Sequence, residues 1–93
     1  MADGEVTNNE ALSQYELTLD GHTAIAAYRR HADHLDFYHT EVPAALEGHG
    51  VGKRLVAAAL ADARRQGLKI IATCPFVHHY IKTHPEEQDL LLG

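Results

Sequence analysis

Three glycines at alternate positions, Gly48, Gly50 and Gly52, constrain this chain more than any other feature of its sequence. Apolar residues at helical spacing begin directly after them, so the stretch is typical of a tight loop that leads into a helix. Glycine accepts positive φ angles and lets another group approach the backbone closely. Such a loop presents unpaired N–H groups at the positive end of the helix dipole, which favours a bound phosphate.

Lys53 and Arg54 fall in the first turn of this expected helix. Cations oppose the helix dipole at this end, so the placement is unfavourable unless an anion binds at the loop. A plain turn is the alternative interpretation. Two familiar phosphate loops do not match: the glycines do not follow G-x-G-x-x-G, and Arg54 stands where a Walker loop has Ser or Thr.

Alternating apolar residues predict three strands before the glycine loop, over residues 13–19, 22–29 and 35–42. Asp20-Gly21 is a hairpin signal, and the other connections are short and polar, so we expect an antiparallel meander. In the third strand, alternation assigns Leu35, Phe37, His39 and Glu41 to one face, and Asp36, Tyr38, Thr40 and Val42 to the other.

The second half of the chain reads as helix, strand and helix. Residues 52–66 form the expected first helix, with Gly67 at the position that ends it. Residues 68–73 read as a fourth strand, which the crossover places parallel to the third. A second helix over residues 75–83 has Pro75 at its first position and Cys74 as its N-cap. The tail ends in three leucines, Leu90 to Leu92, which we expect to pack on the sheet or against a partner.

Size and composition limit the functions open to this chain. Its 93 residues suit a single domain, which we expect over residues 11–93 after a flexible N-terminus over residues 1–10. A net charge of -5 argues against nucleic-acid binding. The single cysteine fits a reducing cytoplasm, and the polar N-terminus and lack of a long apolar run predict neither a signal peptide nor a membrane helix. The eight histidines show no recognised ligand spacing, so we expect no metal.

Two motifs carry a resemblance to a known family. The segment Glu47-Gly-His-Gly-Val-Gly52 is similar to the [RQ]-x-x-G-x-[GA] pyrophosphate loop of the GNAT superfamily of N-acetyltransferases, although Glu47 replaces Arg or Gln. Cys74-Pro-Phe-Val77, Tyr80 and His84-Pro-Glu86 resemble the ending of the short, single-domain GNAT-like group. The resemblance implies a compact α/β (α+β) acyl-CoA N-acyltransferase fold in the order β-β-β-α-β-α, without the family's usual N-terminal helices.

The resemblance also implies where acetyl-coenzyme A binds. Its pantetheine arm is expected along Glu41 and Val42, with the Val42 N–H near the thioester carbonyl, where attack builds an oxyanion. Its pyrophosphate is expected on Gly48, His49, Gly50, Val51, Gly52 and Lys53, with Arg54 within reach of a phosphate.

Two routes of acetyl transfer to an amine remain open at this stage. In direct attack, His39, Glu41 or His79 is the base, and Tyr80 resembles the tyrosine that many members use to protonate the leaving thiolate. In the second route, Cys74 accepts the acetyl group, because the N-cap position favours a thiolate by lowering the pKa of a thiol. The alternative for Tyr80 is a structural role in the core, and the alternative for Cys74 is a small buried side chain without a catalytic role.

The acceptor is not specified by the sequence. The acidic charge suggests a basic amine or a lysine-containing peptide. A homodimer could supply the pocket wall that the missing helices provide in larger relatives. A coenzyme A-binding or protein-interaction module without turnover is the alternative function, and a structural domain without a ligand is the weakest.

Overall fold

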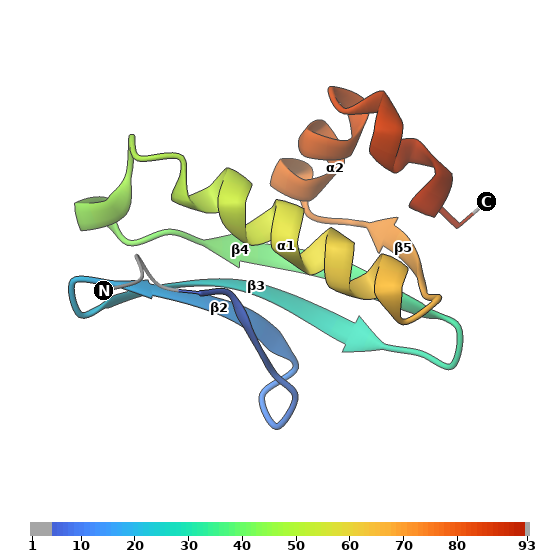
Figure 1. Cartoon of the computed structure of the whole chain (residues 1–93), viewed down its shortest axis with the longest axis horizontal. Coiled ribbons are helices and arrows are strands. Elements are labelled where there is room, and N and C mark those ends of the chain that lie inside the picture. Colours follow the sequence, from blue (N-terminus) through green and yellow to red (C-terminus); the bar gives the residue numbers. More distant parts are fainter. Residues whose placement is uncertain (1–4, 93) are drawn as a thin grey trace.

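The computed structural model describes residues 5–92 as one sheet and the helices that cover it (Figure 1). The strands are β1 (Thr7–Asn9), β2 (Gln14–Leu19), β3 (His22–Arg30), β4 (His34–Glu41) and β5 (Lys69–Ala72). The α-helices are α1 (Val51–Arg65) and α2 (Pro75–Lys82), and the 3₁₀ helices are η1 (Ala44–Leu46) and η2 (Pro85–Leu90).

The sheet runs β1-β2-β3-β4-β5, so neighbouring strands in the chain are also neighbours in space. The β1–β2, β2–β3 and β3–β4 pairs are antiparallel, while β4 and β5 are parallel and are joined through α1. The predicted meander and parallel crossover are therefore confirmed. The observed bounds of β2–β5, α1 and α2 lie within one residue of the predicted ones at each end.

The N-terminal prediction needs a correction, since residues 7–9 are not a frayed end. They form β1, which pairs Thr7 with Glu16 and Asn9 with Gln14. The Asn9 side chain also donates a hydrogen bond to Glu16 Oε2 at 3.0 Å. The sequence did not predict this edge strand, because its residues are polar and show no apolar alternation. Its pairing depends on the turn that follows. Residues 1–4 of the predicted flexible segment lie outside the described residues.

A β-bulge in β4 overturns the predicted faces of that strand. Ala27 pairs with His39 and Tyr28 pairs with Phe37, so Tyr38 is an extra residue without a partner in β3. An extra residue reverses the alternation beyond it. Thr40, opposite the buried Ala26, therefore shares the helix-covered face with Phe37, whereas the sequence assigned it to the opposite face.

The core is one cluster between the helices and a single face of the sheet. The α1 residues predicted to be apolar and inward are all buried, namely Val51, Leu55, Val56, Ala59, Leu60 and Ala63. They pack on Tyr15, Leu17 and Phe37 of the sheet and on Val77 and Ile81 of α2. Ala59 and Ala63 are buried in this cluster, and Figure 1 shows α1 lying across one face of the sheet.

The tail packs against this domain through both apolar and charged contacts. Leu90 is buried in the core, and Leu91 forms a parallel bridge with Ile70 at the outer edge of β5. Arg64, in the last turn of α1, donates hydrogen bonds to both carboxylate oxygens of Asp89, at 2.8 and 2.9 Å. Of the two predicted sites for the leucine tail, the structure shows packing on the sheet.

Candidate functional site

The glycine loop connects η1 to α1 and holds its backbone in conformations that suit glycine. Gly48 has φ +83° and Gly50, the N-cap of α1, has φ +71°. Both lie in the left-handed region, which other residues enter at a cost of about 1 kcal/mol. Within the described residues, no side chain caps this end of α1, and its first turn contains no acidic residue. The first N–H groups of α1 are thus available to an anion.

A cavity of about 280 Å³ opens beside this loop. It is lined by Val42, Leu46, Glu47, Gly48, Gly50, Val51, Gly52, Lys53 and Phe76. Six residues predicted to bind the cofactor, Val42, Gly48, Gly50, Val51, Gly52 and Lys53, therefore meet on one hollow. His49 and Arg54 are not among its lining residues, although they belong to the same loop and first turn.

Gly52 differs from the other two glycines of the loop, because it serves packing and not a positive φ angle. A Cβ at this position would stand 2.9 Å from Cζ of Phe76 and 3.4 Å from Cγ2 of Val42. Phe76 itself is 40% exposed, so its ring forms an open wall of the cavity. Phe76 was not predicted to belong to this site. The signal that could have indicated it is a helical glycine together with an aromatic residue early in the next helix.

Cys74 lies where the β4–β5 pairing ends. The last β4–β5 pair is Phe37 with Ala72, and the Cys74 N–H then donates to the Phe37 carbonyl at 2.9 Å. The chain turns there into α2, with Cys74 as the N-cap and Pro75 as the first helical residue, as predicted. The strand β4 continues past this point, so its later backbone groups on the β5 side extend beyond the last paired residue.

The Cys74 thiol is buried and lies beside the hydroxyl of Thr40. Its side chain is part of the core cluster, and its Sγ lies 3.1 Å from Oγ1 of Thr40, with either atom able to donate. The bulge at Tyr38 makes this contact possible, because without it Thr40 would face the other side of the sheet. A hydroxyl at this distance can donate to a thiolate and stabilise it.

Glu41 and His39, two of the predicted bases, lie on the opposite face of the sheet from Thr40. They pair with Ile25 and Ala27 of β3, neither of which belongs to the core cluster. Their side chains are exposed and bonded to each other, with His39 Nε2 2.9 Å from Glu41 Oε2. The bulge therefore separates them from Cys74, whereas the sequence placed Glu41 on the face of Phe37.

Tyr80 lines a smaller cavity that adjoins the first one. This hollow of about 80 Å³ shares Lys53 and Phe76 with the glycine-loop cavity. It also contains His79, the remaining predicted base, and His84. The ring of Tyr80 stacks on that of His84 at 3.9 Å between centroids. Burial, followed by the charges of Glu87 and Glu86, raises the pKa of Tyr80, so its hydroxyl keeps its proton at neutral pH.

Comparison with known proteins decides the family. The family described as GCN5-related N-acetyl-transferase matches residues 14–90. The chain belongs to the GCN5-related N-acetyltransferase (GNAT) family. The solution structure of a GCN5-like protein from Staphylococcus aureus superimposes on the whole chain, and on 92% of its own, with a TM-score of 0.73 and 34% identity.

Vertebrate relatives match a shorter stretch of this GNAT domain. The protein NATD1 of Gallus gallus and that of Mus musculus are each 41% identical over 56 residues, which is 60% of this chain and 51% of theirs. The chain thus matches about half the length of these relatives. The predicted family and the predicted acyl-CoA N-acyltransferase fold are confirmed.

Two further properties concern the described residues of this GNAT domain. No helix within them is both long and apolar enough to cross a bilayer. No group of three His, Cys, Asp or Glu side chains within them converges in a way that could hold a metal ion.

Proposed function

We propose that this chain binds acetyl-coenzyme A at the glycine loop and transfers the acetyl group to an amine. The observation that carries the proposal is the cavity of about 280 Å³ on which the glycine loop, Lys53 and the end of β4 converge. The pyrophosphate would accept hydrogen bonds from the first N–H groups of α1 and would lie beside the Lys53 ammonium. The pantetheine arm would follow β4 beyond its last pairing with β5 and reach Cys74.

Direct transfer is one route. The amine nitrogen attacks the thioester carbonyl carbon, a C–N bond forms, the C–S bond breaks, and coenzyme A leaves as a thiolate. The Tyr80 hydroxyl is the proposed proton donor to that thiolate: it is protonated at neutral pH, although burial raises its pKa and so makes it a weaker acid. His79 lines the same small cavity as Tyr80 and is the base that this geometry favours over Glu41 for removing the proton of the attacking amine.

Transfer through Cys74 is the other route. The contact between Sγ and the Thr40 hydroxyl supports it, because that hydroxyl can stabilise a thiolate. In this route the Cys74 thiolate attacks the thioester, forms a new C–S bond and releases coenzyme A. The amine then attacks the acyl-cysteine and frees the thiolate again. The Val42 N–H is the proposed donor to the oxyanion in both routes.

The proposal extends to the chemical class of the acceptor and to the redox state of the compartment. The net charge of -5 favours a basic amine or a lysine-containing peptide as acceptor. The single cysteine, which forms no disulfide, fits action in a reducing compartment such as the cytoplasm.

Calorimetric titration with acetyl-coenzyme A tests the proposed site. Gly50→Glu places a carboxylate at the loop, so it should abolish binding. Gly67→Glu is the matched control, because Gly67 has a similar left-handed φ of +75° at the other end of α1. Retained affinity in Gly50→Glu, or equal loss in both variants, would rule out the glycine loop as the binding site.

Mass spectrometry of the same samples and an amine panel test turnover. Acetyl mass on Cys74, together with an inactive Cys74→Ala variant, would support the covalent route. Turnover retained in Cys74→Ala would leave only direct transfer. Binding without consumption of acetyl-coenzyme A by any amine would favour a binding module without catalysis.

A further inference from the structure

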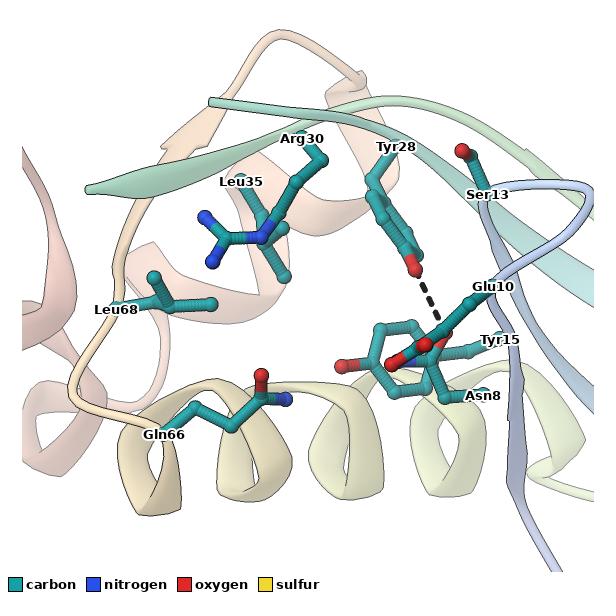
Figure 2. Close-up of a pocket in the computed structure, with 9 residues that line it drawn as sticks. All are labelled: Asn8, Glu10, Ser13, Tyr15, Tyr28, Arg30, Leu35, Gln66 and Leu68. Atoms are coloured by element: carbon teal, nitrogen blue, oxygen red, sulfur yellow. Dashed lines mark hydrogen bonds between the residues drawn. The ribbon is translucent and has the colours of Figure 1, made fainter. Parts of the chain in front are cut away.

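A second cavity lies at the far end of α1 from the glycine loop, between the last turn of that helix and the β1–β2 hairpin (Figure 2). Its volume is about 350 Å³, within the range of small-molecule sites. The 15 residues of α1 separate the two hollows by about 22 Å at the usual helical rise. None of its lining residues is used in the proposed acetyl transfer.

The floor of this cavity is apolar and aromatic. Tyr15, Tyr28, Leu35 and Leu68 line it, and each is at most 7% exposed. The two tyrosine rings lie 5.4 Å apart between centroids. These side chains belong to the core, so the floor is formed before any ligand arrives.

Both tyrosine hydroxyls are held by fixed partners. The Tyr28 hydroxyl donates to Asn8 Oδ1 at 2.7 Å, as the dashed line in Figure 2 shows. The Tyr15 hydroxyl donates to Asp62 Oδ2 at 2.6 Å. Each oxygen keeps a lone pair that can accept a hydrogen bond from a ligand. The floor is therefore preorganised and offers acceptors at defined positions.

The rim carries opposite charges on separate elements. Arg30 comes from the end of β3 and Glu10 from the β1–β2 turn, and in Figure 2 they lie on opposite sides of Tyr28. Burial raises the pKa of Tyr28 and the hydrogen bond with Asn8 lowers it, and the two rim charges act more weakly on the same hydroxyl, with Glu10 raising its pKa and Arg30 lowering it. No ion pair joins Arg30 to Glu10 in the described part of the chain.

This arrangement selects among ligand charges. A simple anion would be attracted by Arg30 but repelled by Glu10. A simple cation would be attracted by Glu10 but repelled by Arg30. A molecule with both charges and a short hydrocarbon chain between them satisfies the two rim residues and covers the apolar floor. The amide of Gln66, at the C-cap of α1, adds a neutral donor and acceptor on the same rim.

We infer that this cavity binds a small zwitterion of the amino-acid type, with its carboxylate on Arg30, its ammonium on Glu10 and its carbon chain over Tyr15 and Tyr28. The inference does not depend on acetyl-coenzyme A, because it concerns a separate hollow and can be tested on the protein alone.

Titration of ¹⁵N-labelled protein, followed by NMR, tests this site. The probes are β-alanine, γ-aminobutyrate and ε-aminocaproate, which differ in the distance between their charges. Butyrate and butylamine each lack one charge and serve as ligand controls. We expect saturable shifts at residues around the cavity for at least one zwitterion, and weaker binding of the one-charge analogues.

Variants make the assignment specific. Arg30→Gln and Glu10→Gln should each raise Kd about tenfold, the usual effect of losing one charge-assisted hydrogen bond. Arg29→Gln is the matched control, since Arg29 is the neighbouring residue on β3 but stacks on Tyr38 at 4.1 Å, on the other face. Absence of shifts for every zwitterion at millimolar concentration, or equal effects of all three substitutions, would overturn the inference.

Discussion

The ring of Phe76 packs so closely on Gly52 that a Cβ at that glycine would stand 2.9 Å from Cζ of the ring. Real Cβ atoms do not come so near to a carbon, so the first turn of α1 and the start of α2 depend on each other for their spacing. This contact also sets the width of the glycine-loop cavity, because both residues line it.

Gly52→Ala should therefore destabilise the protein by up to about 2 kcal/mol, because the Phe76 ring must shift, although alanine has the better helix propensity. Overpacking costs about 1–3 kcal/mol, and the gain in propensity offsets about 1 kcal/mol of it. Urea denaturation measures the change. The double variant Gly52→Ala/Phe76→Leu should recover most of the loss, because a smaller side chain makes room for the methyl group. Equal stability of Gly52→Ala and the wild type would show that the ring moves aside at no cost.

Thr40→Val should slow alkylation of Cys74. The substitution keeps the shape of the side chain but removes the hydroxyl that lies 3.1 Å from Sγ. If that hydroxyl donates to the thiolate, its loss should lower the rate with iodoacetamide about tenfold, as for a hydrogen bond to a charged group. Thr18→Val, at an exposed position in β2, is the control. An unchanged rate would mean that the thiol, and not Thr40, is the donor in the resting protein.

The stability of the fold should fall at high pH because of Tyr15. Burial, with the charge of Tyr28 next, raises the pKa of Tyr15 from 10.0 to about 12. The unfolded chain then loses this proton first, so the stabilisation is complete below pH 10 and disappears as the pH rises towards 12. The expected loss is on the order of 1 to 2 kcal/mol after a discount for solvent screening.

Urea denaturation between neutral and alkaline pH tests this prediction. Tyr15→Phe should be less stable at neutral pH, because it loses the hydrogen bond to Asp62, but its stability should depend less on alkaline pH. Tyr38→Phe changes an exposed tyrosine and should follow the wild type. A Tyr15→Phe curve parallel to the wild-type curve would contradict the assignment.

Arg64→Gln should release the tail from α1. Arg64 contacts Asp89 through both carboxylate oxygens and also contacts Glu87 at 3.1 Å. Its guanidinium lowers the pKa of Asp89, so this contact is present near neutral pH and is lost as the pH falls through the folded pKa of that carboxyl. Amide hydrogen exchange over residues 85–92 should accelerate in the variant. Arg65→Gln, which removes a cation whose partner is Asp62, should leave that segment protected.

The sequence was sufficient for the parts of the fold that local patterning controls. The alternation of Tyr15, Leu17 and Leu19 and the periodicity of α1 are both confirmed by burial. The turn at Asp20-Gly21 is confirmed as well, with both residues at positive φ. In each case one short segment contains the whole signal.

Features that depend on pairing between segments were not predictable in the same way. The bulge at Tyr38 depends on the register between β3 and β4. Because of it, Thr40 lies on the same face of the sheet as the Cys74 thiol and Glu41 lies on the opposite face, the reverse of the predicted arrangement. The contact between Phe76 and Gly52 joins two helices that are read independently in the sequence. The cavity lined by Arg30 and Glu10 likewise combines residues of the meander with the end of α1.

The bridge between Leu91 and Ile70 has a consequence for the behaviour of this protein in solution. The N–H of Leu92 donates to the Ile70 carbonyl at 2.9 Å, so the tail occupies hydrogen-bonding positions on the outer edge of β5. Exposed strand edges are templates on which other chains add strands. Proteolytic loss of these few residues would expose the backbone hydrogen-bonding groups at the edge of β5. Shortened chains would then associate edge to edge into oligomers or fibres.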